Sequence, residues 1–178
     1  MKAYDSLEER LKMVEMHGDV LGRINTAIKK RNSIEACWLC YACFEGRIVR
    51  TLEKLSQGCP EQRCQNNNRV GITTRVECIK RLRKQKYTGL DSFSADVLGQ
   101  VLSWCRERNT LVHALVKLCN YSGMDKKFLD LALKGQPLAE SLYKETTAFR
   151  NQYYKLALPP PFPESVVYRC SLLKRKQN

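Results

Sequence analysis

The sequence predicts an all-α protein, a helical bundle of four to five helices followed by an extended, proline-rich C-terminal tail. Apolar residues recur at intervals of three and four along most of the 178 residues, and no segment alternates as a strand would. Apolar residues make up 43% of the chain, which is enough for one core without metals or disulfides. We therefore expect one all-α domain over residues 1–158, with its core at about 33–156, and an extended basic tail over 159–178.

Two apolar helices are expected first. The apolar positions between Leu7 and Ile28 predict an amphipathic helix, which Gly18 could interrupt. Ser33 is expected to cap a second helix that contains "ACWLCYACFEGRIVRTLEKL" and stops at Gly58. This second helix is the expected centre of the core.

A basic helix is expected next, after a polar loop. The stretch "SQGCPEQRCQNNNRVG" is rich in turn-forming residues and predicts an exposed loop. Thr73 or Thr74 then opens a helix in which Val76, Ile79 and Leu82 face inward and the many cations face water.

Two long helices complete the predicted bundle. Apolar residues keep helical spacing from Val97 to Leu118, and "NYSG" ends this segment. Asp125 is expected to cap the next helix, and "KGQP" marks a kink or a fresh start at Pro137. Helical spacing then continues to Leu156.

The charge balance restricts the partners. The chain has 31 Lys and Arg against 18 Asp and Glu, a net charge of +13 spread along its length. Such a charge indicates a polyanion, an acidic protein or an anionic membrane surface. No apolar run approaches the roughly 20 residues that span a bilayer, and the first residues are charged where a signal peptide is apolar. We expect a cytoplasmic protein with no membrane partner.

The nine cysteines predict buried, reduced thiols. Cys37, Cys40 and Cys43 are three apart, and Cys59 precedes a proline, a spacing similar to that of iron–sulfur ligands. However, the first three lie in a predicted helix among large apolar residues, where free cysteine acts as a small core residue. Cys59 and Cys64 lack a second pair for zinc. We therefore expect no metal and no cofactor.

The most informative stretch is "RERNTLVHAL", which contains one of two histidines. Asn109 and His113 are four apart and share a helix face, whereas Arg108 lies about 140° from His113 at roughly 100° per residue. We expect the long Arg108 side chain to reach the same groove. An imidazole moves protons near neutral pH and a guanidinium holds phosphate, which suits RNA cleavage by the 2′-hydroxyl. The alternative is a structural histidine in a basic helix.

The "RNTLVH" motif, at residues 108–113, resembles the Arg–His signature of the HEPN superfamily. The helices of "CYACFEGRIVRTLEKL", "GITTRVECIKRLRK" and "FLDLALKGQPLAESLYKETTAFRNQYY" are similar to HEPN helices in the same order, over about residues 33–156. The resemblance implies a HEPN-like domain at 1–158 and a metal-independent endoribonuclease with a composite cleft in a homodimer. It implies that Arg108 stabilises the scissile phosphate, His113 is the general acid or base, and Asn109 orients one of them.

The resemblance also indicates binding partners, and two alternative functions stay open. RNA is the expected substrate, in defence or in a toxin–antitoxin pair, and an acidic antitoxin or a nucleotidyltransferase-like protein is the expected protein partner. One HEPN subgroup has a tyrosine two residues after the histidine, where this chain has Leu115, so its nucleotide-transfer regulation does not carry over. The alternatives are a catalytically inactive helical module that binds nucleic acid or nucleotide, and an interaction protein with an acidic partner.

Overall fold

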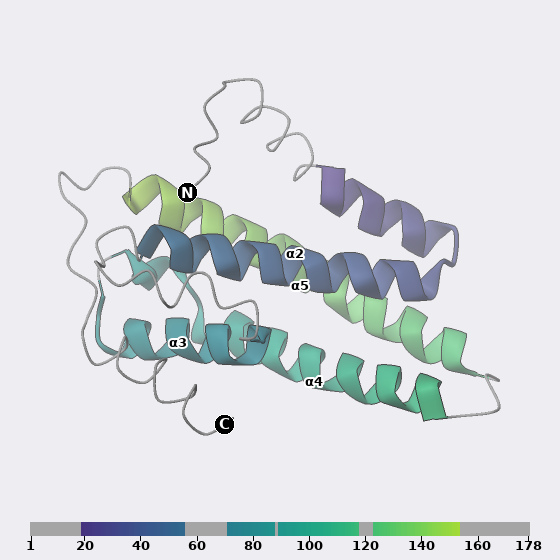
Figure 1. Cartoon of the computed structure of the whole chain (residues 1–178). Helices are drawn as coiled ribbons and strands as arrows, with labels where there is room; N and C mark the ends of the chain where they lie inside the picture. Colours follow the sequence, from purple (N-terminus) through teal and green to yellow (C-terminus); the bar gives the residue numbers. More distant parts are fainter. Residues whose placement is uncertain (1–18, 56–70, 88, 118–122, 154–178) are drawn as a thin grey trace, which may run out of the picture. The chain divides into compact units, whose positions relative to one another are not determined.

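The computed structural model describes residues 19–55, 71–87, 89–117 and 123–153 (Figure 1). Over these ranges the chain forms helices and no strand, which confirms the all-α fold class. The helices are residues 19–29, α2 (Ser33–Leu55), α3 (Ile72–Lys84), the short 3₁₀ helix η3 (Leu90–Ser92), α4 (Ala95–Lys117) and α5 (Met124–Tyr153). Three predicted segments lie outside the described residues. They are almost all of the polar loop, the C-terminal tail and the start of the first helix.

The chain divides into two compact units. Among the described residues, unit one comprises 19–43, 104–117 and 123–140, and unit two comprises 44–55, 71–87, 89–103 and 141–153. Helices α2, α4 and α5 each contribute residues to both units. No helix in the described ranges is long and apolar enough to cross a membrane.

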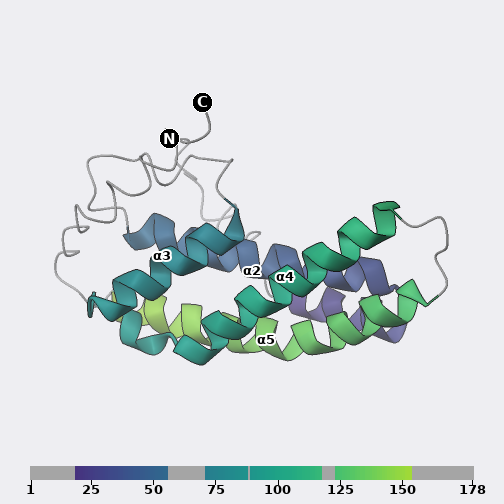
Figure 2. The same ribbon diagram turned by 90° about the horizontal axis from the view of Figure 1, so that it is seen from below.

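Unit one consists of helical residues 19–29 with the first part of α2, the last part of α4 and the first part of α5. Figures 1 and 2 both show these parts of α2, α4 and α5 alongside one another. The periodic apolar positions of each helix supply the core, as the sequence predicts. The buried side chains include Ile24, Ala36, Cys37, Cys40, Trp104, Cys105, Phe128, Leu131, Ala132 and Ala139.

A close approach at Gly135 determines how α5 packs in unit one. The Trp104 indole Nε1 donates a hydrogen bond to the Leu131 carbonyl oxygen at 2.8 Å. A Cβ atom on Gly135 would lie 2.7 Å from that Nε1 and 3.0 Å from the Cys40 Sγ. Because these distances are shorter than real contacts of a Cβ atom, only glycine allows the three helices to meet this closely.

Two expected helix caps are wrong, and they share one reason. Ser33 and Asp125 were predicted to cap α2 and α5, but the Ser33 hydroxyl donates to the Asp125 Oδ1 at 3.3 Å. Their side chains therefore join two helices of unit one rather than satisfy the first amides of their own helices. The Asn32 side-chain amide instead reaches the Glu35 carboxylate at 3.2 Å beside the start of α2.

Pro137 does not start a new helix, since α5 runs without a break from Met124 to Tyr153 with this proline inside. Proline removes one backbone hydrogen bond, which a long packed helix tolerates when its other contacts hold the turn. The fresh start allowed by "KGQP" is therefore wrong.

Unit two has an aromatic core. The Phe149 ring lies 5.7 Å from the Phe93 ring and 5.5 Å from the Tyr153 ring, measured between centroids. Gly89 adopts the left-handed conformation, with φ of 84°, directly beside the Phe149 ring. As predicted, Val76, Ile79 and Leu82 are buried.

A side chain caps the start of α4, whereas α3 has no side-chain cap. The Ser94 hydroxyl accepts hydrogen bonds from the amides of Asp96 and Val97 at the start of α4. Helix α3 begins at Ile72 after Gly71, so neither Thr73 nor Thr74 caps it. Arg75 instead forms an ion pair with Glu45 at 3.1 Å.

We predict that Gly135→Ala lowers the free energy of unfolding by about 1–3 kcal/mol, because the new methyl group displaces the Trp104 indole. Gly99→Ala is the matched control, since a Cβ atom there meets nothing within 4 Å. This control should gain about 0.5–1 kcal/mol from helix propensity. Urea unfolding of both variants measures the difference, and equal stabilities would show that the packing at Gly135 is loose.

Candidate functional site

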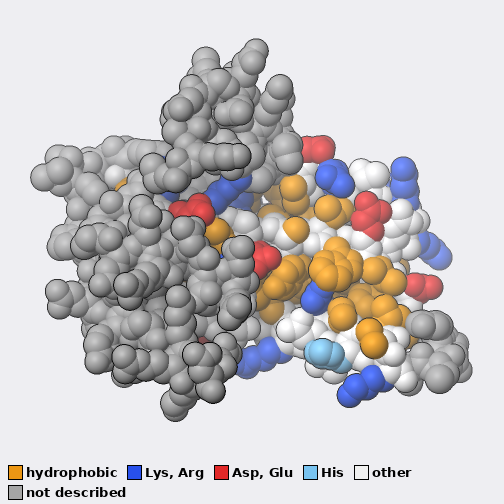
Figure 3. Space-filling model, in the orientation of Figure 1, with side chains coloured by type: hydrophobic (Ala, Val, Ile, Leu, Met, Phe, Trp, Pro, Cys, Tyr) orange, Lys and Arg blue, Asp and Glu red, His pale blue; other side chains and the backbone are white. Residues whose placement is uncertain are grey.

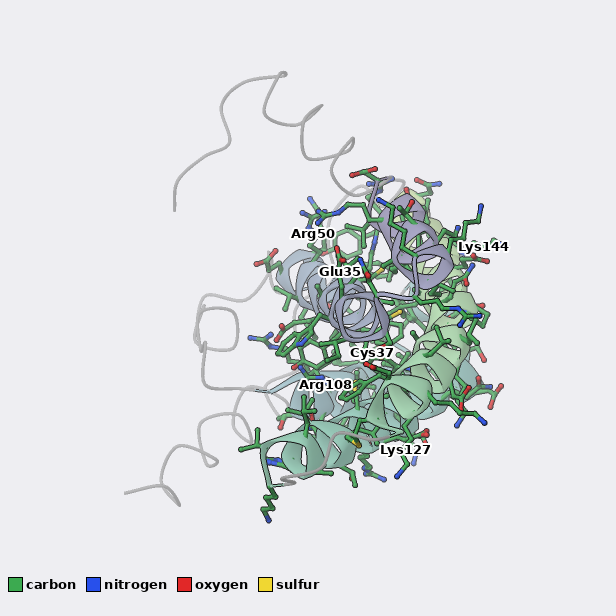
Figure 4. The ribbon with its side chains drawn as sticks, turned by 90° about the vertical axis from the view of Figure 1, so that its right-hand side faces the viewer. Glu35, Cys37, Arg50, Arg108, Lys127 and Lys144 are labelled. Carbon is green, nitrogen blue, oxygen red and sulfur yellow. The ribbon has the colours of Figure 1, made fainter. Side chains whose placement is uncertain are left out.

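The three residues predicted for the site all lie on the part of α4 that belongs to unit one. Arg108 is buried, with 8% of its surface exposed. Its Cζ atom lies 4.0 Å from the centroid of the Trp38 ring and 4.7 Å from that of the Tyr41 ring. Its Nη1 donates a hydrogen bond to the Asn109 Oδ1 at 3.1 Å. Figure 4 shows Arg108 between α2 and α4.

Helix α2 supplies both aromatic rings because Trp38 and Tyr41 are three residues apart and share one side of the helix. The buried Cys37 and Cys40 belong to the side of α2 that faces the core. The two rings meet edge to face, with centroids 6.5 Å apart and an interplanar angle of 78°. A planar guanidinium packs well against such rings, and we call Trp38, Tyr41 and Arg108 the Arg108 stack.

The burial of Arg108 makes opposing contributions to stability. A cation over aromatic rings gains roughly 0.5–2 kcal/mol. The Arg108 Nη2 is buried with no hydrogen-bond partner, and an unsatisfied buried donor costs about 1–3 kcal/mol. Because these terms oppose each other and a buried charge also loses its hydration, stability alone does not explain why an arginine occupies this position.

His113 lies one helical turn after Asn109 and is exposed. The Asn109 side chain accepts a hydrogen bond from Arg108, and Asn109 shares a face of α4 with His113 by helical spacing. The sequence predicted that Arg108 would reach toward the groove of His113. In the structure the guanidinium turns toward α2 instead, because the two aromatic rings offer it a desolvated stacking surface.

Sequence reasoning missed Trp38 and Tyr41, which were grouped with the core of the second helix. A signal was present in the spacing, because Cys37, Cys40 and Phe44 already form one apolar face of that helix. Trp38 lies about 100° from Cys37 and about 200° from Cys40 on a helical projection, away from the middle of that face. A large aromatic residue at such a position indicates a surface role.

An apolar patch surrounds the Arg108 stack on the surface of unit one. Ile34 and Trp38 from α2 are 38% and 52% exposed, and Val116 near the end of α4 is 82% exposed. Leu111, Val112 and Leu115 are half-buried, although their helical spacing matched that of the core residues before them. Figure 3 shows hydrophobic side chains gathered over this part of the molecule. The last two turns of α4 therefore leave the core.

The described cysteines are buried thiols. The Cys37 Sγ donates to the Phe128 carbonyl oxygen at 3.1 Å. Burial raises the pKa of Cys37 to about 12 despite the opposing charge of Arg108, and burial also raises the pKa of Cys40. Among the described residues no three metal-ligating side chains cluster, while Cys59 and Cys64 lie outside that part of the chain.

Comparison of the chain with known proteins gives no match. The chain matches no protein-family model, no curated protein and no solved structure.

We predict that Cys37 and Cys40 resist alkylation by iodoacetamide at pH 8. A thiol whose pKa is raised keeps its proton through this pH, and the thiolate is the reactive form. Peptide mapping should find both residues modified at least about 100-fold faster in urea than in the native protein. Rapid native labelling of Cys37 would mean that this part of α2 opens readily.

We predict that Arg108→Met leaves the free energy of unfolding within about 1 kcal/mol of the wild-type value, because it fills the space without burying a charge. Arg108→Ala leaves a gap between two rings and should cost about 1–3 kcal/mol. Urea unfolding compares the two variants. If methionine is as damaging as alanine, the guanidinium itself is needed to hold unit one together.

Proposed function

We propose that the chain is a cytoplasmic, metal-independent endoribonuclease of HEPN type that acts as a homodimer. The observation that carries the proposal is the arrangement on α4: a guanidinium fixed by Asn109 and two rings, and an exposed imidazole one turn beyond Asn109. The proposed general acid or base is exposed, and the charged group lies five residues earlier on the same helix. The net charge of +13 supplies attraction to RNA phosphates.

The reaction needs only these groups. The 2′-oxygen of a nucleotide attacks the adjacent phosphorus while His113 of one chain accepts the 2′-hydroxyl proton. The bond from phosphorus to the 5′-oxygen breaks, and His113 of the second chain donates a proton to that oxygen. Arg108 stabilises the charge on the non-bridging oxygens, and the products are a 2′,3′-cyclic phosphate and a 5′-hydroxyl.

Arg108 must move to contact a phosphate, since it is nine-tenths buried. The buried Nη2, which has no hydrogen-bond partner, supports such a movement. A hydrogen bond between a guanidinium and a phosphate contributes about 1.5–3 kcal/mol, and Nη2 loses no hydrogen bond when it leaves the stack. The phosphate would therefore draw the guanidinium out at little cost.

A second copy of the chain is part of the proposal, because one histidine cannot readily serve as both base and acid at one phosphate. The apolar residues at the end of α4, the half-buried Val112 and Leu115 and the exposed Val116, offer a surface for that copy. Control by an acidic antitoxin or a nucleotidyltransferase-like partner in a toxin–antitoxin or defence system fits the strongly basic chain.

The burial of Arg108 favours a second candidate, a helical nucleic-acid-binding module without catalysis. In this reading the guanidinium stays in the stack and RNA is held by surface cations, such as Arg81, Arg83 and Lys84 in the last turn of α3. RNA binding without cleavage would favour this candidate. Binding to acidic proteins in preference to RNA would favour a pure interaction protein.

We predict that His113→Ala reduces the rate of RNA cleavage in EDTA by about 100-fold to 10,000-fold, the usual loss when a proton-transfer group is removed. The melting temperature should change little, because His113 is exposed. Arg106→Ala is the matched control on the same helix: Arg106 is also exposed and should affect only RNA affinity.

Cleavage of a labelled RNA by purified wild-type and variant chains makes the measurement. The proposal fails if the wild-type chain does not cut RNA, or if Arg106→Ala and His113→Ala are equally damaging.

A further inference from the structure

Trp38 is exposed, and the packing of the core does not require a tryptophan at this position. It is 52% exposed, whereas its neighbours Ala36, Cys37 and Cys40 are fully buried and form the inner face of α2. A tryptophan that leaves half of its surface in water forgoes much of the hydrophobic stabilisation it could provide. Its position is therefore better explained by what the ring presents to solvent.

One face of the Trp38 indole is already covered. The Arg108 guanidinium lies over the ring at 4.0 Å, and Tyr41 meets Trp38 edge to face. Because only one face carries the guanidinium and half of the side chain remains exposed, the opposite face is open to solvent. The result is a flat apolar surface with a positive charge stacked behind it.

A flat surface backed by a cation matches an unpaired nucleobase. Nucleobases stack on aromatic rings whatever their sequence, and the phosphate attached to each base is attracted by the charge beneath the ring. In a duplex the base faces are covered by neighbouring pairs and are not available for stacking. An apolar side chain from a second copy would bring no such negative charge to the stack.

We infer that Trp38 is a base-stacking residue that makes the chain selective for single-stranded RNA. The inference rests on the proposed function, in which Arg108, the residue stacked on Trp38, contacts the phosphate. It adds the kind of RNA, single-stranded, that the chain would bind. The nucleotide stacked on Trp38 lies next to the phosphate that Arg108 would contact. Trp38 acts in binding, apart from the proton transfer of His113.

The test uses a single-stranded RNA oligonucleotide with 2′-O-methyl groups, which has no attacking hydroxyl and stays intact, and the same strand in a duplex. Fluorescence anisotropy measures the Kd of wild type, Trp38→Leu, Trp38→Phe and Leu133→Ala. Leu133→Ala is the matched control, because Leu133 is a large apolar residue 49% exposed on α5 of the same unit.

Wild type should bind the single strand more tightly than the duplex. Trp38→Leu should weaken single-strand binding about 10-fold to 100-fold, the usual effect of losing one stacked base. Trp38→Phe should recover part of it, and Leu133→Ala should match wild type. The salt dependence of Kd should keep the wild-type slope in Trp38→Leu, because no phosphate contact is removed.

Two results would overturn the inference. One is an unchanged single-strand Kd in Trp38→Leu. The other is a Trp38→Leu variant that sediments as a monomer when wild type is a dimer and binds both RNAs equally weakly, which would make Trp38 part of the protein interface. Because the oligonucleotide cannot be cleaved, these outcomes do not depend on whether the chain is a ribonuclease.

Discussion

The contact between the Arg108 guanidinium and the two aromatic rings of α2 is the interaction on which the site depends. It places a permanent positive charge in a mostly desolvated position, with one hydrogen bond to Asn109 and one donor unsatisfied. A group that served stability alone would be better replaced by an apolar side chain of similar volume. The contact therefore holds a buried positive charge that stability alone does not explain.

The packing of unit one keeps that contact in place. Gly135 lets α5 approach Trp104 and Cys40, and the Trp104 indole is tied to the Leu131 carbonyl oxygen. Arg108 lies one turn of α4 after Trp104, so this close packing also fixes where the guanidinium leaves the helix. The buried Cys37 and Cys40 are small enough to allow it, which gives their short spacing a structural reason.

Periodicity predicted the helices well, because the inward positions of α3 and the first turns of α4 follow the core. Prediction from the sequence failed where side chains of different helices form hydrogen bonds with each other. Ser33 and Asp125 have the composition of caps, but only the fold reveals that they are close enough to bond each other. It also failed at Val112 and Leu115, since a periodic apolar face does not say whether another helix covers it.

The site was predicted in part. The motif predicted Arg108, Asn109 and His113 as site residues, and helical geometry predicted that Asn109 and His113 share a face. The partners of Arg108 were not predictable, because Trp38 and Tyr41 are about 70 residues away in the sequence and approach it only through packing. The direction taken by a long side chain depends on such partners rather than on its place in the helix.

The most direct test of the central claim is the chemistry of the RNA ends produced by the wild-type chain in EDTA. Mass spectrometry of a cleaved oligonucleotide should find a 2′,3′-cyclic phosphate on one fragment and a 5′-hydroxyl on the other, since the 2′-oxygen is the attacking group. Intact RNA, or fragments with 3′-hydroxyl and 5′-phosphate ends, would contradict the account.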